Sequence, residues 1–203
     1  MLNLVLVSKN KFFDIPGPTT KDEEKNSSEY FISKYLLAHY EKIKNLDKDL
    51  KRLPTSEEFF FLQSDTSFNA FTFIPLVGKK ESIKELYAST YSISRKVVDA
   101  LIQLYDEGII EKITLMISDS LIKRNPATID YIKAQINSRA NFEVIFSWVH
   151  AKVCILKTPG NFYVIEGSGN WASNAQYEQY IFANSKGLYN FRKTLFTESN
   201  LRG

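Results

Sequence analysis

The sequence predicts an α/β protein, an α/β/α sandwich built on a mixed, mostly parallel sheet. Strand-like and helix-like segments alternate between residues 59 and 136, an order typical of parallel strands covered by helices on both faces. A later run of β-branched and aromatic residues is followed by the turn signal Thr158-Pro159-Gly160-Asn161 and a second apolar run, which indicates a hairpin. The 44% hydrophobic content supplies a core, and only 8 Gly and 6 Pro argue against a disordered or fibrous chain.

The first quarter of the chain predicts an extension of the main domain. Residues 4–7 form a short apolar run that predicts a strand and is too short to cross a bilayer. Residues 30–50 carry apolar side chains at alternating steps of four and three, which predicts a helix with His39 on its apolar face. That face suits a packed histidine best, although it could also form a dimer contact. We therefore expect residues 1–55 to be a strand and helical extension packed on a domain of residues 56–203.

The middle of the chain supplies the alternating elements. The expected strands cover residues 59–62, 70–76 and 113–117, and the expected helices cover residues 81–105 and 126–136. Gly108 is expected to end the first of these helices. The final segment, residues 188–203, is expected to carry a short helix and a frayed end. The length of 203 residues fits one domain with an extension.

The segment Phe142–Leu156 contains no Gly or Pro, which predicts a strand pair or one long strand. His150 and Lys152 lie two positions apart, so in a strand their side chains share a face. After the turn, a return strand at Phe162–Ile165 leads to Ser168 and Asn170. The hairpin can therefore bring a hydroxyl and an amide next to the imidazole and the ammonium.

These residue types suit attack on a phosphodiester. An imidazole can act as the nucleophile, and an ammonium and an amide supply fixed positive potential for phosphoryl oxygens. Each fragment alone is common by chance, because His-x-Lys tripeptides are frequent and Gly-Ser-Gly-Asn usually forms a loop. Their joint occurrence in this order, across one hairpin, favours a phosphodiester site.

The same residues resemble the phospholipase D superfamily, whose pattern joins His-x-Lys to a downstream Gly-Ser-x-Asn and an acidic residue. The residues that carry the resemblance are His150, Lys152, Gly167, Ser168, Asn170 and Glu178. The resemblance covers about residues 70–185 and implies a phospholipase D-like fold. Lys157 stands where the family has an Asp, and the gap to Gly167 is longer. The Asp is a supporting residue in this family, and the tyrosyl-DNA phosphodiesterases are similar in lacking it.

The resemblance also implies a dimer. The family uses two His-Lys-Asn sets, one histidine attacking phosphorus and the other protonating the leaving oxygen. This chain has 2 His, and only His150 is followed by a Lys at the right spacing. A complete site would then need two chains facing each other across a two-fold axis, the commonest symmetry. Glu178 is expected to hold the nucleophilic ring in one tautomer, as a triad acid does, with Glu166 as the competing acid.

Composition excludes several classes of protein. The single Cys154 rules out an intrachain disulfide, and 2 His with 1 Cys offer no zinc site, so no cofactor and no metal are expected. The net charge of +3 is too small to indicate nucleic acid by itself. A local basic surface could be formed by Lys79, Lys80, Lys123, Arg124, Lys152, Lys157 and Lys186, or these can be separate solvated side chains. We expect a soluble, cytoplasmic protein with no stable membrane association.

Four aromatic residues flank the proposed site: Trp148, Trp171, Tyr177 and Tyr180. Core positions are the simpler interpretation, with Trp171 as the candidate for stacking on a base. The expected function is a metal-independent nuclease or related phosphodiesterase that acts on DNA or RNA through a phosphohistidine intermediate. The alternatives are a catalytically degenerate domain that binds nucleic acid or protein, and a phospholipase. A phospholipase would need an interfacial apolar surface, for which only Phe12-Phe13 and Phe59–Phe61 are candidates.

Overall fold

The computed structural model describes residues 37–43, 45–67, 69–172 and 174–198, with the backbone alone for the first range. All of them belong to one compact unit, residues 35–203. The strand expected at residues 4–7 lies outside the described residues.

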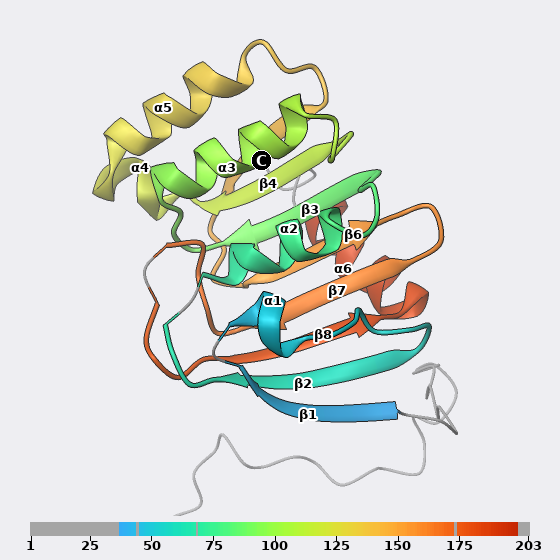
Figure 1. Cartoon of the computed structure of the whole chain (residues 1–203). Helices are drawn as coiled ribbons and strands as arrows, with labels where there is room; N and C mark the ends of the chain where they lie inside the picture. Colours follow the sequence, from blue (N-terminus) through green and yellow to red (C-terminus); the bar gives the residue numbers. More distant parts are fainter. Residues whose placement is uncertain (1–36, 44, 68, 173, 199–203) are drawn as a thin grey trace, which may run out of the picture. The chain divides into compact units, whose positions relative to one another are not determined.

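This unit is built on an eight-stranded sheet in the order β1-β2-β8-β7-β6-β3-β4-β5, which Figure 1 shows as a stack of arrows. The strands are β1 Leu37–Ile43, β2 Glu58–Ser64, β3 Glu85–Thr90, β4 Ile113–Ser118, β5 Phe142–Ser147, β6 Val153–Lys157, β7 Phe162–Gly167 and β8 Gln179–Asn184. Strands β6 and β8 run against all the others. The expected mixed sheet with mostly one strand direction is confirmed.

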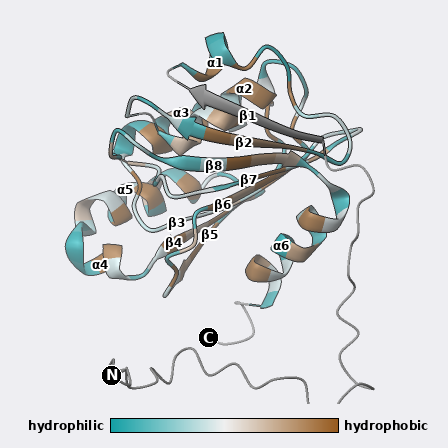
Figure 2. Cartoon of the chain, turned by 90° about the horizontal axis from the view of Figure 1, so that it is seen from below, coloured by the Kyte–Doolittle hydropathy of each residue, from teal (hydrophilic) through white to brown (hydrophobic). Residues whose placement is uncertain are grey.

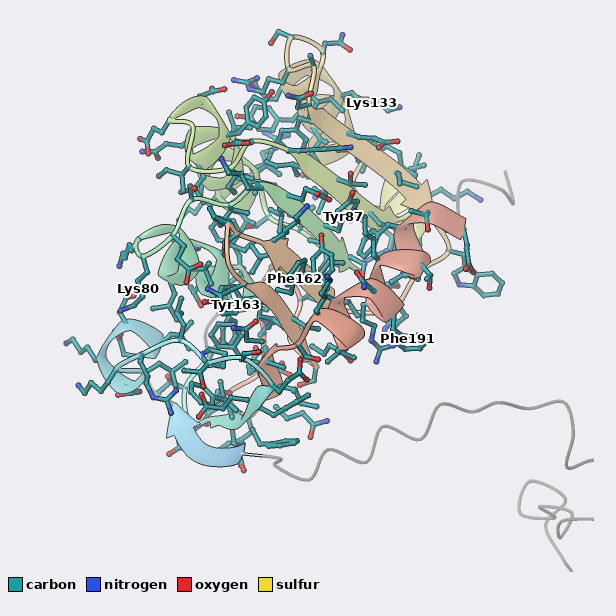
Figure 3. The ribbon with its side chains drawn as sticks, turned by 90° about the vertical axis from the view of Figure 1, so that its right-hand side faces the viewer. Lys80, Tyr87, Lys133, Phe162, Tyr163 and Phe191 are labelled. Carbon is teal, nitrogen blue, oxygen red and sulfur yellow. The ribbon has the colours of Figure 1, made fainter. Side chains whose placement is uncertain are left out.

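Helices cover both faces of the sheet (Figure 2). One face carries α1 Leu46–Asp49, the 3-10 turn η2 Ala70–Thr72, α2 Phe73–Gly78, α3 Arg95–Asp106, α4 Ser120–Arg124 and α5 Pro126–Ile136. The other face carries α6 Lys186–Glu198. Figure 3 shows Tyr87 and Phe162 on the α6 side, where their rings lie 5.5 Å from Phe196 and 5.3 Å from Tyr189. The expected α/β/α layers are therefore confirmed.

The helix ends follow the local sequence. The side chain of Ser94 accepts a hydrogen bond from Val97 N at the start of α3, and Asn125 does the same for Thr128 N at the start of α5. Gly108, with a φ of 72°, follows the end of α3 as expected.

The helix expected over residues 30–50 is wrong over the described part. Residues 37–43 form β1, parallel to β2, and only Leu46–Asp49 are helical. The spacing of apolar residues in this segment suited a helix. Pairing with β2 gives its backbone N–H and C=O groups partners in a sheet instead, so the tertiary context overrides the local pattern. His39 lies in this strand, in register with Phe60.

Two further boundaries differ from expectation. The strand expected at residues 70–76 is η2 followed by α2, because Asn69 caps the turn by accepting from Phe71 N. The helix expected over residues 81–105 is β3 followed by α3. Strand β3 lies between β4 and β6 and is buried along almost its whole length. Its sequence therefore lacks the alternation of apolar and polar residues that distinguishes a half-buried strand from a helix.

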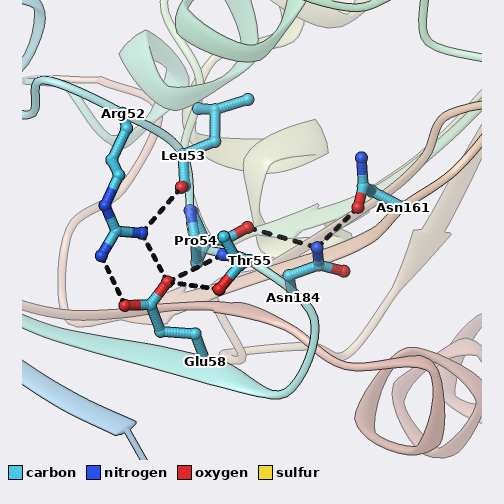
Figure 4. Close-up of polar contacts among 7 residues, drawn as sticks. All are labelled: Arg52, Leu53, Pro54, Thr55, Glu58, Asn161 and Asn184. Atoms are coloured by element: carbon cyan, nitrogen blue, oxygen red, sulfur yellow. Dashed lines mark hydrogen bonds and ion pairs between the residues drawn. The ribbon is translucent and has the colours of Figure 1, made fainter.

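A polar anchor fixes the start of β2 (Figure 4). The buried carboxylate of Glu58 accepts from both terminal nitrogens of Arg52, at 2.5 and 2.7 Å, and from Thr55 N at 2.8 Å. The Arg52 hydrogen bonds are the main cause that lowers the Glu58 pKa to about 2. Nearby, Asn184 Nδ2 donates to Pro54 O at 3.2 Å, which ties the same loop to β8.

Candidate active site

His150 and Lys152 lie in the connection between β5 and β6, whereas Ser168, Asn170 and Glu178 lie in the connection between β7 and β8. Strands β5 and β6 are separated in the sheet by β3 and β4, so their connection crosses the ends of both. We call this the site edge: the edge at which β3, β4, β5 and β7 end and β6 and β8 begin. Residues 148–152 are not in a strand, so of the two alternatives expected for Phe142–Leu156 the one long strand is wrong and two strands are present. The backbone of residues 148–152 is held instead by Ser89 Oγ, which donates to Ala151 O at 3.0 Å.

His150 and Lys152 contact each other at this edge, although not through strand geometry. Lys152 Nζ lies 3.1 Å from His150 Nδ1 and 3.5 Å from Nε2, and donates to His150 O at 2.8 Å. His150 is exposed, whereas Lys152 is partly buried. Burial lowers the Lys152 pKa, against the opposing charges of Glu178 and Tyr91. The pair presents an accessible imidazole with a cation directly beside it.

The segment Gly167–Trp171 is held against the same edge. Gly167 N donates to Lys152 O at 3.3 Å, which joins the motif's two halves. Trp171 N donates to Thr90 Oγ1 at 3.2 Å and to Ser92 O at 3.1 Å, just beyond β3. The hairpin therefore brings the Gly-Ser-Gly-Asn turn beside Lys152, as the sequence predicts.

Two glycines let this turn lie close to β8. A Cβ at Gly167 would be 2.3 Å from Gln179 O, and one at Gly169 would be 2.1 Å from Tyr180 Oη. Neither position has room for a side chain. Lys152, Gly167, Gly169, Trp171 and Tyr180 line a small pocket beneath the turn.

Ser168 and Glu178 form a contact of their own. Ser168 Oγ donates to the Glu178 carboxylate and accepts from Gln179 N at 3.1 Å. The other carboxylate oxygen accepts from Ala175 N at 3.2 Å. Glu178 thus braces the Gly-Ser turn and makes no hydrogen bond to His150 within the part of the chain that the structure describes.

The expected role of Glu178, holding the imidazole, is therefore not seen in this structure, because its carboxylate is bound to Ser168. The neighbours of the imidazole are Lys152 and Tyr91, whose ring centroid lies 4.9 Å from that of His150. The competing acid Glu166 points to the other face, where it pairs with Arg192 of α6 at 2.6 and 2.7 Å. Glu166 is thereby removed from the site.

Asn170 lies in the turn between these groups. Its backbone N donates to Asn174 Oδ1 at 2.7 Å, and its backbone O accepts from Asn174 Nδ2 at 2.8 Å. Its own Oδ1 is buried and has no hydrogen-bond partner among the described residues. A buried amide oxygen without a hydrogen bond costs folding free energy, so the Asn170 side chain is a candidate to reorient and form a hydrogen bond when a ligand binds.

Lys157, the residue in place of the family's Asp, lies far from the site. It is five positions from Lys152, roughly 16 Å along an extended chain. Its Nζ pairs with Glu85 at 3.1 Å, and Glu85 also pairs with Lys193 of α6 at 2.7 Å. Burial raises the Glu85 pKa, but hydrogen bonds from Lys193 and Lys157 outweigh it and bring the pKa to about 2. The replacement alters a pairing at the opposite edge of the sheet and removes no group from the site edge.

The single basic surface considered from the sequence is divided. Lys123, Arg124 and Lys152 lie at the site edge, after β4 and before β6. The others belong to elements at the opposite edge: Lys79, Lys80, Lys157 and Lys186. Lys79 is also neutralised by an ion pair with Asp47.

Of the four aromatic residues expected to flank the site, two are buried and two are exposed. Trp171 is 2% exposed and packs edge-on against Phe71, and Tyr180 is 3% exposed, so the core interpretation is right for both. The same interpretation is wrong for Trp148, which is 93% exposed, and for Tyr177, which is 65% exposed. Trp171 cannot stack on a base because its ring is buried.

Tyr91 is a neighbour of the site that the sequence did not indicate, and it contacts Arg124, which the sequence offered only as part of a possible basic surface. The Arg124 guanidinium lies 4.4 Å from the Tyr91 ring centroid and donates to Tyr91 O at 3.4 Å. Tyr91 directly follows β3, so a correct placement of that strand would have pointed to it. The sequence analysis named Arg124 as a basic residue but gave no reason to place it beside Tyr91.

The residues that the structure describes hold no group of three or more His, Cys, Asp or Glu side chains placed to bind a metal ion. Their helices include none with the length and apolar character needed to cross a membrane.

No protein-family model and no curated protein matches the chain. Among solved structures, the chain is similar to a polyphosphate kinase from Porphyromonas gingivalis, with 12% identity and a TM-score of 0.48 over 64% of this chain and 23% of the kinase. It is also similar to Nuc, a phospholipase D family member from Salmonella typhimurium, with 15% identity and a TM-score of 0.48 over 70% of this chain and 94% of that one. The chain thus spans about a quarter of the kinase.

Proposed function

We propose that the chain is a phosphodiesterase of the phospholipase D type that cleaves nucleic acid without a metal. The observation that carries the proposal is the contact between His150 and Lys152 at a sheet edge, with the Gly-Ser-Gly-Asn turn hydrogen-bonded to the Lys152 carbonyl. An exposed imidazole beside a fixed cation suits attack on an anionic phosphodiester.

The proposed reaction has two steps. First, a neutral His150 attacks phosphorus and forms a P–N bond, the P–O bond to the leaving group breaks, and that oxygen takes a proton from a second imidazolium. Next, water attacks phosphorus and gives its proton to the second imidazole, while the P–N bond breaks and His150 is regenerated. Lys152 and Asn170 hold the non-bridging oxygens throughout. One water is consumed for each bond cleaved.

The second imidazole is proposed to be His150 of another copy of this chain. The two steps require one of the two facing imidazoles to be neutral for attack and the other to be protonated for the leaving group. The expected assembly is a symmetric dimer with the two site edges facing each other.

The test uses the purified full chain with labelled single-stranded and duplex DNA and RNA in EDTA. Cleavage should persist in EDTA, disappear in His150→Ala and fall at least 100-fold in Lys152→Ala. Lys186→Ala, at the opposite edge, is the matched control and should cleave normally. Cleavage that chelation abolishes, or that survives His150→Ala, would contradict the proposed chemistry.

A mixing experiment tests the shared site. An excess of His150→Ala chains, exchanged with wild-type chains, should lower the activity per wild-type chain, because mixed dimers lack one imidazole. Unchanged activity per wild-type chain would show that each copy works alone. If no substrate is cleaved but nucleic acid binds to the wild type and His150→Ala equally, the chain is instead a degenerate binding domain.

A further inference from the structure

The most exposed aromatic residue of the described chain lies next to the candidate site. Trp148 is 93% exposed and sits between the end of β5 and His150. Tyr177, at 65% exposure, immediately precedes Glu178. A nearly fully exposed Trp leaves a large apolar ring in water, whereas Trp is highly buried on average.

Cations accompany this ring at the site edge. Lys123 and Arg124 form the exposed last turn of α4, which follows β4, the neighbour of β5. Neither of them, nor Lys152, makes an ion pair with any residue that the structure describes. Their positive charge is therefore available to an anion in solution.

A stack of rings and cations joins these residues to the reactive imidazole. Arg124 lies over Tyr91, whose ring contacts that of His150. Arg124 Nη2 is fixed by Ser120 Oγ at 3.1 Å, so its guanidinium is oriented before any ligand arrives.

Building on the proposed function, we propose that the site edge binds single-stranded nucleic acid, with Trp148 stacked on an unpaired base and Arg124 on a phosphate. Aromatic rings alternating with cations suit a single strand, because unpaired bases offer their flat faces and the backbone offers its charge. In a duplex those faces are already stacked, so Trp148 would have nothing to cover it.

The surroundings of Trp148 argue against an apolar partner. A ring that packs on lipid or on a second copy normally belongs to a contiguous apolar patch. Here the exposed side chains that follow β4 include the charged Asp119, Lys123 and Arg124, with Ile122 as the one large apolar side chain among them. A ring in mainly charged surroundings suits a polyanion with flat bases better than an apolar surface.

Tryptophan fluorescence tests the proposal directly. The chain has 2 Trp, and Trp171 is buried, so changes caused by an added ligand report on Trp148. The His150→Ala chain is titrated with a single-stranded oligothymidylate, so that no cleavage disturbs the measurement. We expect saturable quenching that weakens with salt. Trp148→Ala in the same background should lose the quenching and bind about 5- to 100-fold more weakly.

The matched control is Phe191→Ala, which removes an exposed aromatic ring of α6 and should leave oligonucleotide affinity unchanged. Equal affinity for duplex, or equal affinity of Trp148→Ala and its parent, overturns the proposal. So does a blue shift of Trp148 emission with anionic phosphatidylserine vesicles in place of quenching by the oligonucleotide. Acrylamide quenching of Trp148 fluorescence is also measured without nucleic acid at rising protein concentration. If quenching weakens as the protein concentration rises, a second copy covers the ring, and the proposal is overturned.

The two proposals fail separately. Binding is measured on a chain that cannot cleave, so binding through Trp148 without any wild-type cleavage would refute only the proposed function. Normal cleavage with a Trp148→Ala chain that binds single strands as well as its parent would refute only the inference about Trp148.

Discussion

Replacing Gly169 by alanine should disturb the Gly-Ser-Gly-Asn turn in a way that can be calculated from the structure. The new Cβ would lie 2.1 Å from Tyr180 Oη, where ordinary contact begins at 3.4 Å, so about 1.3 Å must be gained. The hydroxyl is buried in the core beneath the turn and cannot simply swing away. Overpacking of this kind costs about 1–3 kcal/mol, which lowers the melting temperature of a chain of this length by roughly 2–12 °C.

The matched control is Gly160→Ala, at the hairpin tip, where a Cβ would meet nothing within 4 Å. It should change the unfolding free energy by less than about 0.5 kcal/mol. Adding Tyr180→Phe to Gly169→Ala removes the hydroxyl and leaves the ring carbon at 3.0 Å, so at least about 1 kcal/mol should be recovered relative to additivity. Urea unfolding of the wild type, Gly169→Ala, Tyr180→Phe and the double variant measures this coupling. A loss equal to that of Gly160→Ala, or no coupling to Tyr180→Phe, would refute the close contact.

Three other outcomes are expected. The lowered Glu58 pKa, about 2 against 4.5 unfolded, contributes stability that is complete above pH 4.5 and lost as the pH falls toward 2. The unfolding free energy of Glu58→Gln should therefore lack this dependence on acid pH. The stability lost is at most about 3 kcal/mol, and it is smaller than that because solvent screens the half-exposed Arg52. Lys157→Asp would place a carboxylate beside Glu85, so it should destabilise the fold by about 1 kcal/mol while the activity per folded chain stays unchanged in a cleavage assay. Burial raises the pKa of Cys154, so its thiol should resist iodoacetamide until urea unfolds the chain, and rapid native labelling would contradict its buried position.

The hairpin and its motif could be predicted because their signals are local. Thr158-Pro159-Gly160-Asn161 marks the turn, and the runs on either side have the length and composition of strands. The hydrogen bond from Gly167 N to Lys152 O follows from that pairing. The sequence alone therefore predicts that Lys152 lies close to the Gly-Ser turn.

The crossing that carries His150 could not be predicted in the same way. Whether Phe142–Leu156 is one strand or two depends on which strands lie between them in the sheet, and that is a property of the whole topology. Because β5 and β6 are separated by two strands, residues 148–152 span their ends and leave Trp148 in solvent. Local composition suggested a core position for this residue, and only the sheet order shows otherwise.

Tyr91, a neighbour of the imidazole, was missed for a related reason. Tyr91 follows β3, and β3 was hidden within a longer helical pattern. Residues that meet at the ends of parallel strands come from segments far apart in the sequence. Their convergence on His150 has no short-range signal, unlike the motif itself.

Strand order also bears on where a second imidazole can come from. The only other histidine, His39, lies in β1, which is separated from β6 by β2, β8 and β7. Four strand spacings of about 4.8 Å put these two strands roughly 19 Å apart, and His39 is in the middle of its strand, away from the site edge. Two imidazoles that act on one phosphate must both reach its oxygens, within about 3 Å of the reacting atoms. Within one chain this sheet cannot bring His39 to His150, so a two-histidine reaction requires the second copy that the mixing experiment is designed to detect.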